Sequence, residues 1–246
     1  NDGIVYAELR FSPAFIRRLT GLSYSEAVEA VLEGARGAGP AIPVNFILIV
    51  PQPEGERVAW DTVRLAADYL SNGVTGVDIA DDTRTLGLEE YARAVAWARA
   101  NGLGVTVHAG EAQGPSSVRV AVEQLGATRI GHGVRSIEDD RVVEMLVDRG
   151  TLLEVCPTSN VHTQVTPSIR EHPLPRLIER GVSVCLSTDD PGISNITLTG
   201  EYELVQETFG LSRADLALMN VRAARYAFAG SEQRAALMEC LGDSAS

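Results

Sequence analysis

Gly104-Val-Thr-Val-His-Ala-Gly-Glu111 is an apolar stretch that ends in a histidine, a glycine and a glutamate. The run of β-branched residues favours a buried strand. In α/β enzymes the side chains that carry chemistry lie at the carboxyl ends of parallel strands. This stretch therefore predicts an α/β fold in which His108 and Glu111 lie at the end of a strand.

The same pattern recurs along the chain. Apolar, β-rich runs occupy residues 4–11, 44–50, 74–80, 104–109, 129–132, 152–156 and 183–187. Residues 23–36, 58–71, 88–101, 116–125, 138–149 and 174–180 have a helical apolar period, and the first of these stretches opens with Ser23 and Glu26 at capping-box spacing. Strands that alternate with helices predict parallel pairing through right-handed crossovers. After the last strand we expect helices at residues 198–210, 212–228 and 231–241.

The distribution of polar residues separates two kinds of parallel sheet. A doubly wound sheet concentrates its chemistry at one crevice and often has a glycine-rich phosphate loop. Neither G-x-G-x-x-G nor G-x-x-x-x-G-K-[ST] occurs in this sequence. Polar groups instead follow at least five of the predicted strands, which favours a TIM-type (β/α)8 barrel. Because only seven strands are predicted, we expect residues 1–246 to form a single barrel domain that lacks its first strand.

Composition excludes several functional classes. Asp and Glu number 33 against 21 Lys and Arg, and the net charge of −12 argues against nucleic acid as a partner. No apolar run reaches the roughly 18 residues that a membrane span needs. The three cysteines have spacings that suit neither a disulfide framework nor a zinc ribbon. We therefore expect a cytoplasmic protein, while its oligomeric state is left open.

Three strand ends carry the candidate chemistry. His108 and Glu111 follow one strand, His132 lies between glycines at the end of another, and Asp189 and Asp190 follow the last one. Taken singly, each has a structural interpretation: a hydrogen-bonded core histidine, a helix-capping carboxylate, or an Asp-Asp-Pro turn. Taken together, they match a catalytic zinc site built from His and carboxylate ligands. The residue types thus indicate metal-assisted hydrolysis of a small molecule, with either histidine as a possible ligand.

At these residues the sequence resembles the adenosine deaminase family of zinc hydrolases. The matching segments occur in family order over nearly the whole chain: Tyr6-Ala-Glu-Leu-Arg-Phe-Ser-Pro13, Gly76-Val-Asp-Ile-Ala80, Val107-His-Ala-Gly-Glu111, Arg129-Ile-Gly-His-Gly133, Cys156-Pro-Thr-Ser-Asn160, Ser187-Thr-Asp-Asp-Pro191 and Leu198-Thr-Gly-Glu-Tyr202. Any one segment is weak evidence, but the ordered set is specific.

The resemblance implies a role for each matching position. His108 and Asp189 would be ligands of one Zn²⁺. Glu111 would protonate the purine ring nitrogen beside the attacked carbon. His132 would orient and deprotonate the attacking water and would not bind the metal. Asp190 would hydrogen-bond the five-membered ring of the purine.

The resemblance also implies a reaction and a set of substrates. Adenosine, and with it 2'-deoxyadenosine, would lose ammonia to give inosine-type products in purine metabolism. The alternatives within the same chemistry are an adenine deaminase and a deaminase of a modified adenosine. Gly110 would let the backbone approach the substrate closely. Where the family has a glycine that contacts the purine, this sequence has Asp81, whose carboxylate adds bulk and charge near the base.

A second departure concerns the metal. The opening strand of the family carries a His-x-His pair of zinc ligands, and the four histidines here form no such pair. We interpret the sequence as amino-terminally truncated, with two further ligands expected from the missing segment. We accordingly expect this chain alone to fold poorly and to bind zinc weakly, because an open barrel exposes two sheet edges. A catalytically inactive, purine-binding relative is the alternative of a different class.

Several other residues have structural interpretations. Glu8 and Arg10 share a strand face and are predicted to form an interior ion pair. Asp78 is expected to belong to a polar network behind the site. His162 and His172 lie in a proline-rich stretch and are predicted to be surface residues. Cys156 and Cys185 are predicted to be core thiols.

Overall fold

All strands of the protein run in the same direction and follow one another in chain order. The computed structural model describes residues 2–39, 42–80 and 87–242. In these ranges the strands are β1 (Ala7–Phe11), β2 (Val44–Pro51), β3 (Val74–Ala80), β4 (Gly104–Ala109), β5 (Arg129–His132), β6 (Leu152–Val155) and β7 (Ser183–Leu186). They form one sheet in the order β1-β2-β3-β4-β5-β6-β7 with parallel pairing throughout.

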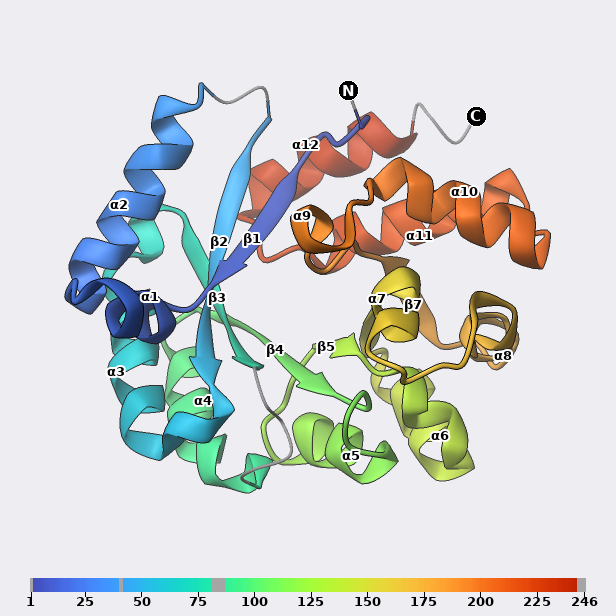
Figure 1. Cartoon of the computed structure of the whole chain (residues 1–246), viewed down its shortest axis with the longest axis horizontal. Helices are drawn as coiled ribbons and strands as arrows, with labels where there is room; N and C mark the ends of the chain where they lie inside the picture. Colours follow the sequence, from blue (N-terminus) through green and yellow to red (C-terminus); the bar gives the residue numbers. More distant parts are fainter. Residues whose placement is uncertain (1, 40–41, 81–86, 243–246) are drawn as a thin grey trace.

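Helices follow the strands and cover the outside of the curled sheet (Figure 1). They are α1 (Pro13–Thr20), α2 (Tyr24–Gly37), α3 (Gly55–Asp68), α4 (Ala92–Ala100), α5 (Pro115–Glu123), α6 (Asp140–Arg149), α7 (Pro157–His162), α8 (Leu174–Glu179), α9 (Pro191–Ser194), α10 (Leu198–Phe209), α11 (Arg213–Tyr226) and α12 (Ser231–Gly242). This is the incomplete TIM-type barrel that the sequence predicts. No helix in the described ranges has both the length and the apolar character of a membrane span.

The start of α2 shows how local sequence sets an element boundary. The Ser23 hydroxyl accepts a hydrogen bond from the Glu26 amide, and the Glu26 carboxylate accepts one from the Ser23 amide. This reciprocal capping satisfies two amides that would otherwise lack partners at the helix terminus. The capping box predicted from the sequence is confirmed.

Alternation along β4 separates the apolar core from the polar interior of the barrel. Val105 and Val107 are buried in the hydrophobic core that the surrounding helices cover. Thr106 and His108 lie on the other face, where Thr106 donates to Glu154 at 2.8 Å. Since successive side chains of a strand point to opposite faces, one residue step decides between core and site.

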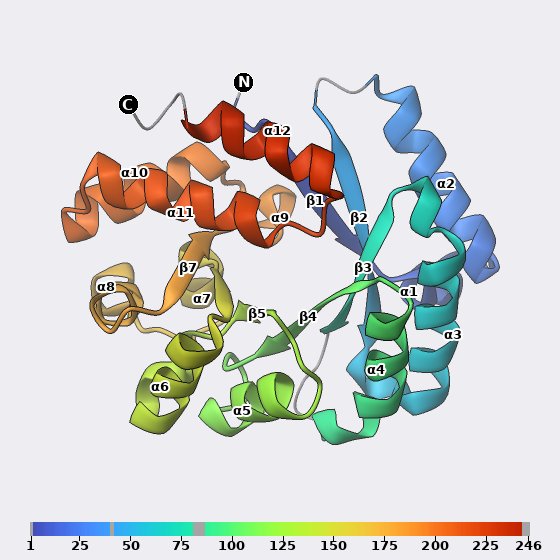
Figure 2. The ribbon, with the colours of Figure 1, turned by 180° about the vertical axis from the view of Figure 1, so that it is seen from behind.

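The segment after α11 packs against the amino-terminal ends of the central strands. The Phe228 ring lies so close to Gly76 and Gly104 that a Cβ atom at Gly104 would lie 2.2 Å from it. The Arg129 guanidinium stacks 3.9 Å from the centroid of the same ring. Helix α11 runs past β7 (Figure 2), and the carboxy-terminal helices therefore belong to the packing of the barrel.

Candidate active site

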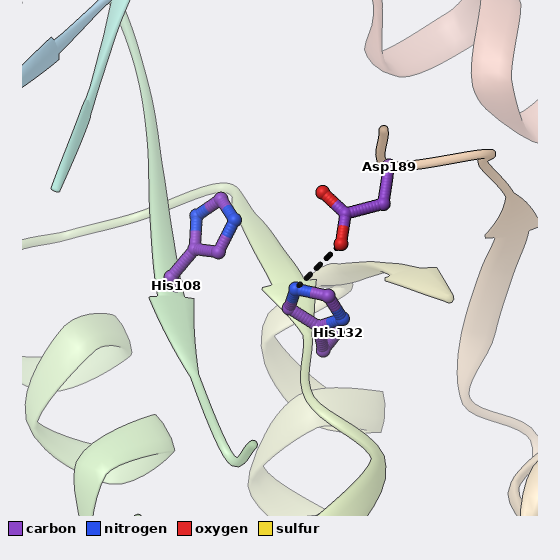
Figure 3. Close-up of side chains that lie close together, drawn as sticks. All are labelled: His108, His132 and Asp189. Atoms are coloured by element: carbon purple, nitrogen blue, oxygen red, sulfur yellow. Dashed lines mark ion pairs between the residues drawn. The ribbon is translucent and has the colours of Figure 1, made fainter. Parts of the chain in front are cut away.

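Three side chains from separate strands converge at the carboxyl edge of the sheet (Figure 3). His108 is on β4, His132 ends β5, and Asp189 follows β7. One ligand atom from each lies within 4.8 Å of the others, and the two imidazole centroids are 5.1 Å apart. The structure thus brings together residues that lie up to 81 positions apart in the sequence, from 108 to 189.

His108 is anchored from behind by Asp78. Its Nδ1 atom lies 3.1 Å from Asp78 Oδ1, and the Asp78 side chain is fully buried on β3. Burial alone would lower the pKa of His108, but the Asp78 carboxylate outweighs burial and raises it. A carboxylate behind a histidine orients the ring and directs its other nitrogen into the site. The expected network behind the site is confirmed at Asp78.

His132 is buried at a sharp turn of the backbone. Its φ of 62° lies in the left-handed region, which is costly for a residue with a side chain. The turn directs Nε2 toward two carboxylates, with Glu111 Oε2 at 3.6 Å and Asp189 Oδ2 at 4.0 Å. Burial and the neighbouring His108 lower the pKa of His132. The imidazole is therefore held neutral among acidic groups.

Asp189 also has a left-handed backbone, with φ of 56°. Ser159 of α7 donates a hydrogen bond to Asp189 Oδ2 at 2.8 Å. This contact holds Oδ2, the same carboxylate oxygen that faces His132 Nε2 at 4.0 Å. His132 and Asp189 thus both have strained φ values. Such strain is typical of functional positions, where the surrounding structure keeps the backbone in place.

Gly131 makes room for His108. A Cβ atom at Gly131 would lie 2.9 Å from His108 Nδ1 and within 3.1 Å of other ring atoms. A larger residue at this position of β5 would therefore displace the ring from Asp78. Gly131, the residue before His132, thus leaves space for a side chain of the neighbouring strand β4, which the sequence pattern does not reveal.

The remaining predicted site residues lie around this centre or outside the described part of the chain. Glu111 accepts a hydrogen bond from Thr163 Oγ1 at 3.2 Å and faces His132. Gly110 has a φ of 65°, and its amide donates to Ser117 Oγ at 2.9 Å. Asp190 is exposed beside Asp189, and partial burial followed by the Asp189 charge raises its pKa. Asp81 lies outside the described residues.

A buried ion network fills the barrel interior below the site. Arg10 contacts Asp78 at 2.7 Å and Glu154 at 2.5 Å, while Arg129 contacts Glu8 at 2.5 Å and Glu154 at 2.7 Å. The predicted Glu8–Arg10 pair is wrong. The two residues lie on one face of β1, but each finds a partner on another strand because the curl of the sheet brings those charges closer.

The prediction for His172 is also wrong. The side chain is buried, with 3% of the residue exposed, whereas the prediction placed it at the surface. His172 Nε2 lies 3.2 Å from Asn160 Oδ1, and Asn160 Nδ2 lies 3.1 Å from His132 Nδ1. Proline-rich surroundings suggest a loop, yet this loop folds back beneath α7. Asn160, which lies in the segment Cys156–Asn160 that resembles the family, and His172 therefore join the site, and no local sequence signal distinguishes His172 from a surface residue.

The donor set fits a divalent transition metal. Imidazole and carboxylate are ligands that zinc accepts in catalytic sites, where a further position stays open, and each histidine of this group lies at ligand spacing from Asp189. The described residues outside this group contain no other cluster of three such side chains at ligand spacing. Cys156 and Cys185 are buried free thiols, as predicted, and burial raises the pKa of Cys185 to about 12. They are core residues, and the site uses nitrogen and oxygen donors.

The sequence matches the family described as adenosine deaminase over residues 1–244. A protein of Rhizobium leguminosarum bv. trifolii named adenine deaminase is 41% identical, and the match covers 95% of this chain and 73% of that protein. A protein of Shewanella loihica named adenosine deaminase is 36% identical, over 96% of this chain and 72% of that protein. These names differ in the substrate and agree on the reaction class.

A solved structure has the same fold. The apo N6-methyl-AMP deaminase of Arabidopsis thaliana superposes with a TM-score of 0.88 at 29% identity, covering 99% of this chain and 73% of that one. The name of that protein gives a third substrate, N6-methyl-AMP, for the same class of reaction. With a family match over nearly the entire sequence and relatives above 30% identity, this chain belongs to the adenosine deaminase family of hydrolases.

Proposed function

We propose that this protein hydrolytically deaminates the adenine ring of a purine. Water adds to the carbon that bears the amino group, the carbon–nitrogen bond breaks, and ammonia leaves. The observation that carries the proposal is the convergence of His108, His132 and Asp189 at one edge of the sheet, with Glu111 beside them. This set provides both metal ligands and proton-transfer groups in one place.

We propose that His108 and Asp189 hold a zinc ion. His108 is supported by Asp78, and Asp189 is fixed by Ser159, so both have the supporting hydrogen bonds that metal ligands commonly have. A zinc ion held there would make hydroxide available near neutral pH. The other polar residues of the site then act on the substrate.

We propose separate roles in proton transfer, water orientation and substrate binding for the other site residues. Glu111 is the group placed to deliver a proton to the ring nitrogen beside the attacked carbon, which makes that carbon more electrophilic. His132, whose Nε2 lies 3.6 Å from Glu111 Oε2, is proposed to orient the attacking water. Asp190, exposed beside Asp189, is proposed to hydrogen-bond the five-membered ring. Gly110 and Asp81 remain proposed substrate contacts.

Sequence identity to named relatives ranks the candidate substrates. Those named adenine deaminases reach 40–41% identity, while those named adenosine deaminases reach 35–37%. Free adenine is therefore the first substrate to test, ahead of the adenosine that the sequence motifs suggest. The Arabidopsis relative makes an adenosine monophosphate with a substituted amino group the third.

The test is an assay of amine release from these three compounds by the protein supplied with excess zinc. We expect one of them to be deaminated, and we expect Glu111→Gln to lower kcat by at least about 100-fold because a positioned acid typically contributes that much. Glu138→Gln, which changes an exposed glutamate paired with Arg135, is the matched control and should keep the activity. Full activity in Glu111→Gln would contradict the assignment. Purine binding without any amine release would instead favour an inactive purine-binding relative.

A further inference from the structure

A chain of buried hydrogen bonds runs from the loop after α7 to the ring of His132. His172 Nε2 contacts Asn160 Oδ1 at 3.2 Å, and Asn160 Nδ2 contacts His132 Nδ1 at 3.1 Å. All three side chains are buried, with exposed fractions of 3%, 0% and 2% in that order. Because these side chains are shielded from solvent, every donor along this chain of hydrogen bonds has to face an acceptor.

The direction of these hydrogen bonds follows from a backbone amide. The Leu174 N–H donates to His172 Nδ1 at 3.1 Å, so this nitrogen is the acceptor. Burial lowers the pKa of His172 to about 4, so the ring is neutral near pH 7 and its hydrogen is on Nε2. That N–H requires the oxygen of Asn160 as its acceptor. The amide nitrogen of Asn160 therefore faces His132 and donates to Nδ1.

The groups on the other side of the His132 ring also favour a hydrogen on Nε2. Its Nε2 atom faces carboxylate oxygens of Glu111 at 3.6 Å and of Asp189 at 4.0 Å. Carboxylates are acceptors, so they favour a hydrogen on the nitrogen that faces them. A donor on one side and acceptors on the other select a single neutral tautomer.

We propose that Asn160 and His172 are positioning residues that hold His132 in its neutral form with the hydrogen on Nε2. His132 then presents an N–H to the site and has no lone pair there. It acts as a hydrogen-bond donor toward the attacking oxygen, and this revises the expectation that it deprotonates the water. The tautomer of His132 does not depend on the proposed deamination. Only the role of its N–H toward the attacking oxygen rests on that proposed function.

His108 has the opposite tautomer, because its partner is an acceptor. Its Nδ1 faces the Asp78 carboxylate and so carries the hydrogen, which leaves the lone pair of Nε2 free for a metal. Two histidines with centroids 5.1 Å apart are thereby assigned different tasks by their partners. His108 is suited to bind a metal through Nε2, and His132 is not.

The test is nitrogen NMR of the metal-free, ligand-free protein with isotopically labelled histidine. Couplings between ring nitrogens and ring carbon hydrogens distinguish the two neutral tautomers, and the chain has four histidines to assign. His132→Gln identifies the His132 signals by their loss. His162→Gln, which changes an exposed histidine, should leave them unchanged. We expect the hydrogen of His132 on Nε2, and a hydrogen on Nδ1 would overturn the proposal.

Two substitutions test the cause. Asn160→Asp replaces the amide donor by a second acceptor, so His132 Nδ1 should gain a hydrogen. His172→Phe removes the group that orients Asn160 and should leave His132 a mixture of tautomers, whereas His172→Gln, which can still donate to Asn160, should restore the wild-type form. A folded Asn160→Asp protein in which His132 Nδ1 carries no hydrogen would show that Asn160 does not control the ring. If a variant fails to fold, the wild-type spectrum still decides the tautomer, and neither outcome depends on whether the protein deaminates a purine.

Discussion

His108 and His132 show how the surroundings of a residue, and not its type, decide its chemistry. His108 lies one residue before the end of β4, His132 ends the neighbouring β5, and both are held inside the barrel. Asp78 accepts from one ring, while Asn160 donates to the other. The sequence could predict that both histidines belong to a site. It placed Asp78 in a network behind the site, but it could not pair Asp78 with His108 or Asn160 with His132, because these partners lie 30 and 28 positions apart along the chain.

Arg129 provides a residue-scale test of the buried ion network. Its guanidinium is the cation that contacts Glu8, and it also contacts Glu154, with 5% of its side chain exposed. Arg129→Met should lower the free energy of unfolding by about 3–5 kcal/mol because buried carboxylates lose their partner. Denaturant unfolding measures this. Arg135→Met, which breaks the exposed pair with Glu138, should cost less than about 1 kcal/mol, and equal losses would argue against a buried network.

His172 predicts a pH dependence of stability. Burial lowers the pKa of its imidazole to about 4 from 6.5, so the unfolded chain binds more protons than the folded one between these values. The resulting stabilisation is fully present above pH 6.5 and is lost as the pH falls toward 4, by about 3 kcal/mol in all. His172→Gln should remove this part of the slope in unfolding experiments across that range. His162→Gln should keep the wild-type slope, and identical slopes in all three proteins would contradict a buried, neutral His172.

At the scale of elements, strand ends carry the site and short helices support it. The bounds of β3, β4 and β5 follow from runs of β-branched and apolar residues, and their ends at Ala80, Ala109 and His132 agree with the sequence prediction. The sequence did not predict α7 or α9, because helices of six and four residues have too few turns to show a period. Yet α7 contributes both Ser159 and Asn160 to the site.

Ser159 tests the supporting role of α7. Its hydroxyl donates to Asp189 Oδ2 at 2.8 Å, and Ser159→Ala leaves that carboxylate free to rotate. We expect zinc affinity to fall by about 10–100-fold, as is typical when a hydrogen bond to a metal ligand is removed. Competition with a chelating dye measures the affinity. Ser168→Ala changes a hydroxyl that bonds Glu171 away from the site and serves as the control; unchanged affinity in Ser159→Ala would argue against Asp189 as a ligand.

At the scale of the whole molecule, the open sheet has two edges. In the described ranges β1 pairs with β2 alone, and β7 pairs with β6 alone. A cavity of about 350 Å³ lies between these edges, lined by Arg10, Glu154 and residues of α11, and it does not include His108, His132 or Asp189. The sequence predicted the number of strands and their parallel order. It could not predict this cavity, which depends on how the carboxy-terminal helices pack.

The exposed edge at β1 predicts self-association. Leu9 is 50% exposed there, and an unprotected apolar edge pairs readily with other chains. We expect light scattering to show a mass that rises with protein concentration and Leu9→Lys to reduce the rise, since a charged side chain blunts an edge. Leu19→Lys, at a more exposed position on α1, is the control for added charge and should have little effect. A monomer at all concentrations would contradict this prediction.

An anomalous-scattering map from crystals of this protein soaked with zinc tests the proposed metal site most directly. We predict one strong peak at bonding distance, about 2 Å, from both His108 Nε2 and the Asp189 carboxylate, with His132 Nε2 uncoordinated. A peak ligated by His132 in place of His108, or zinc bound only away from the carboxyl edge of the sheet, would contradict the assignment of this site.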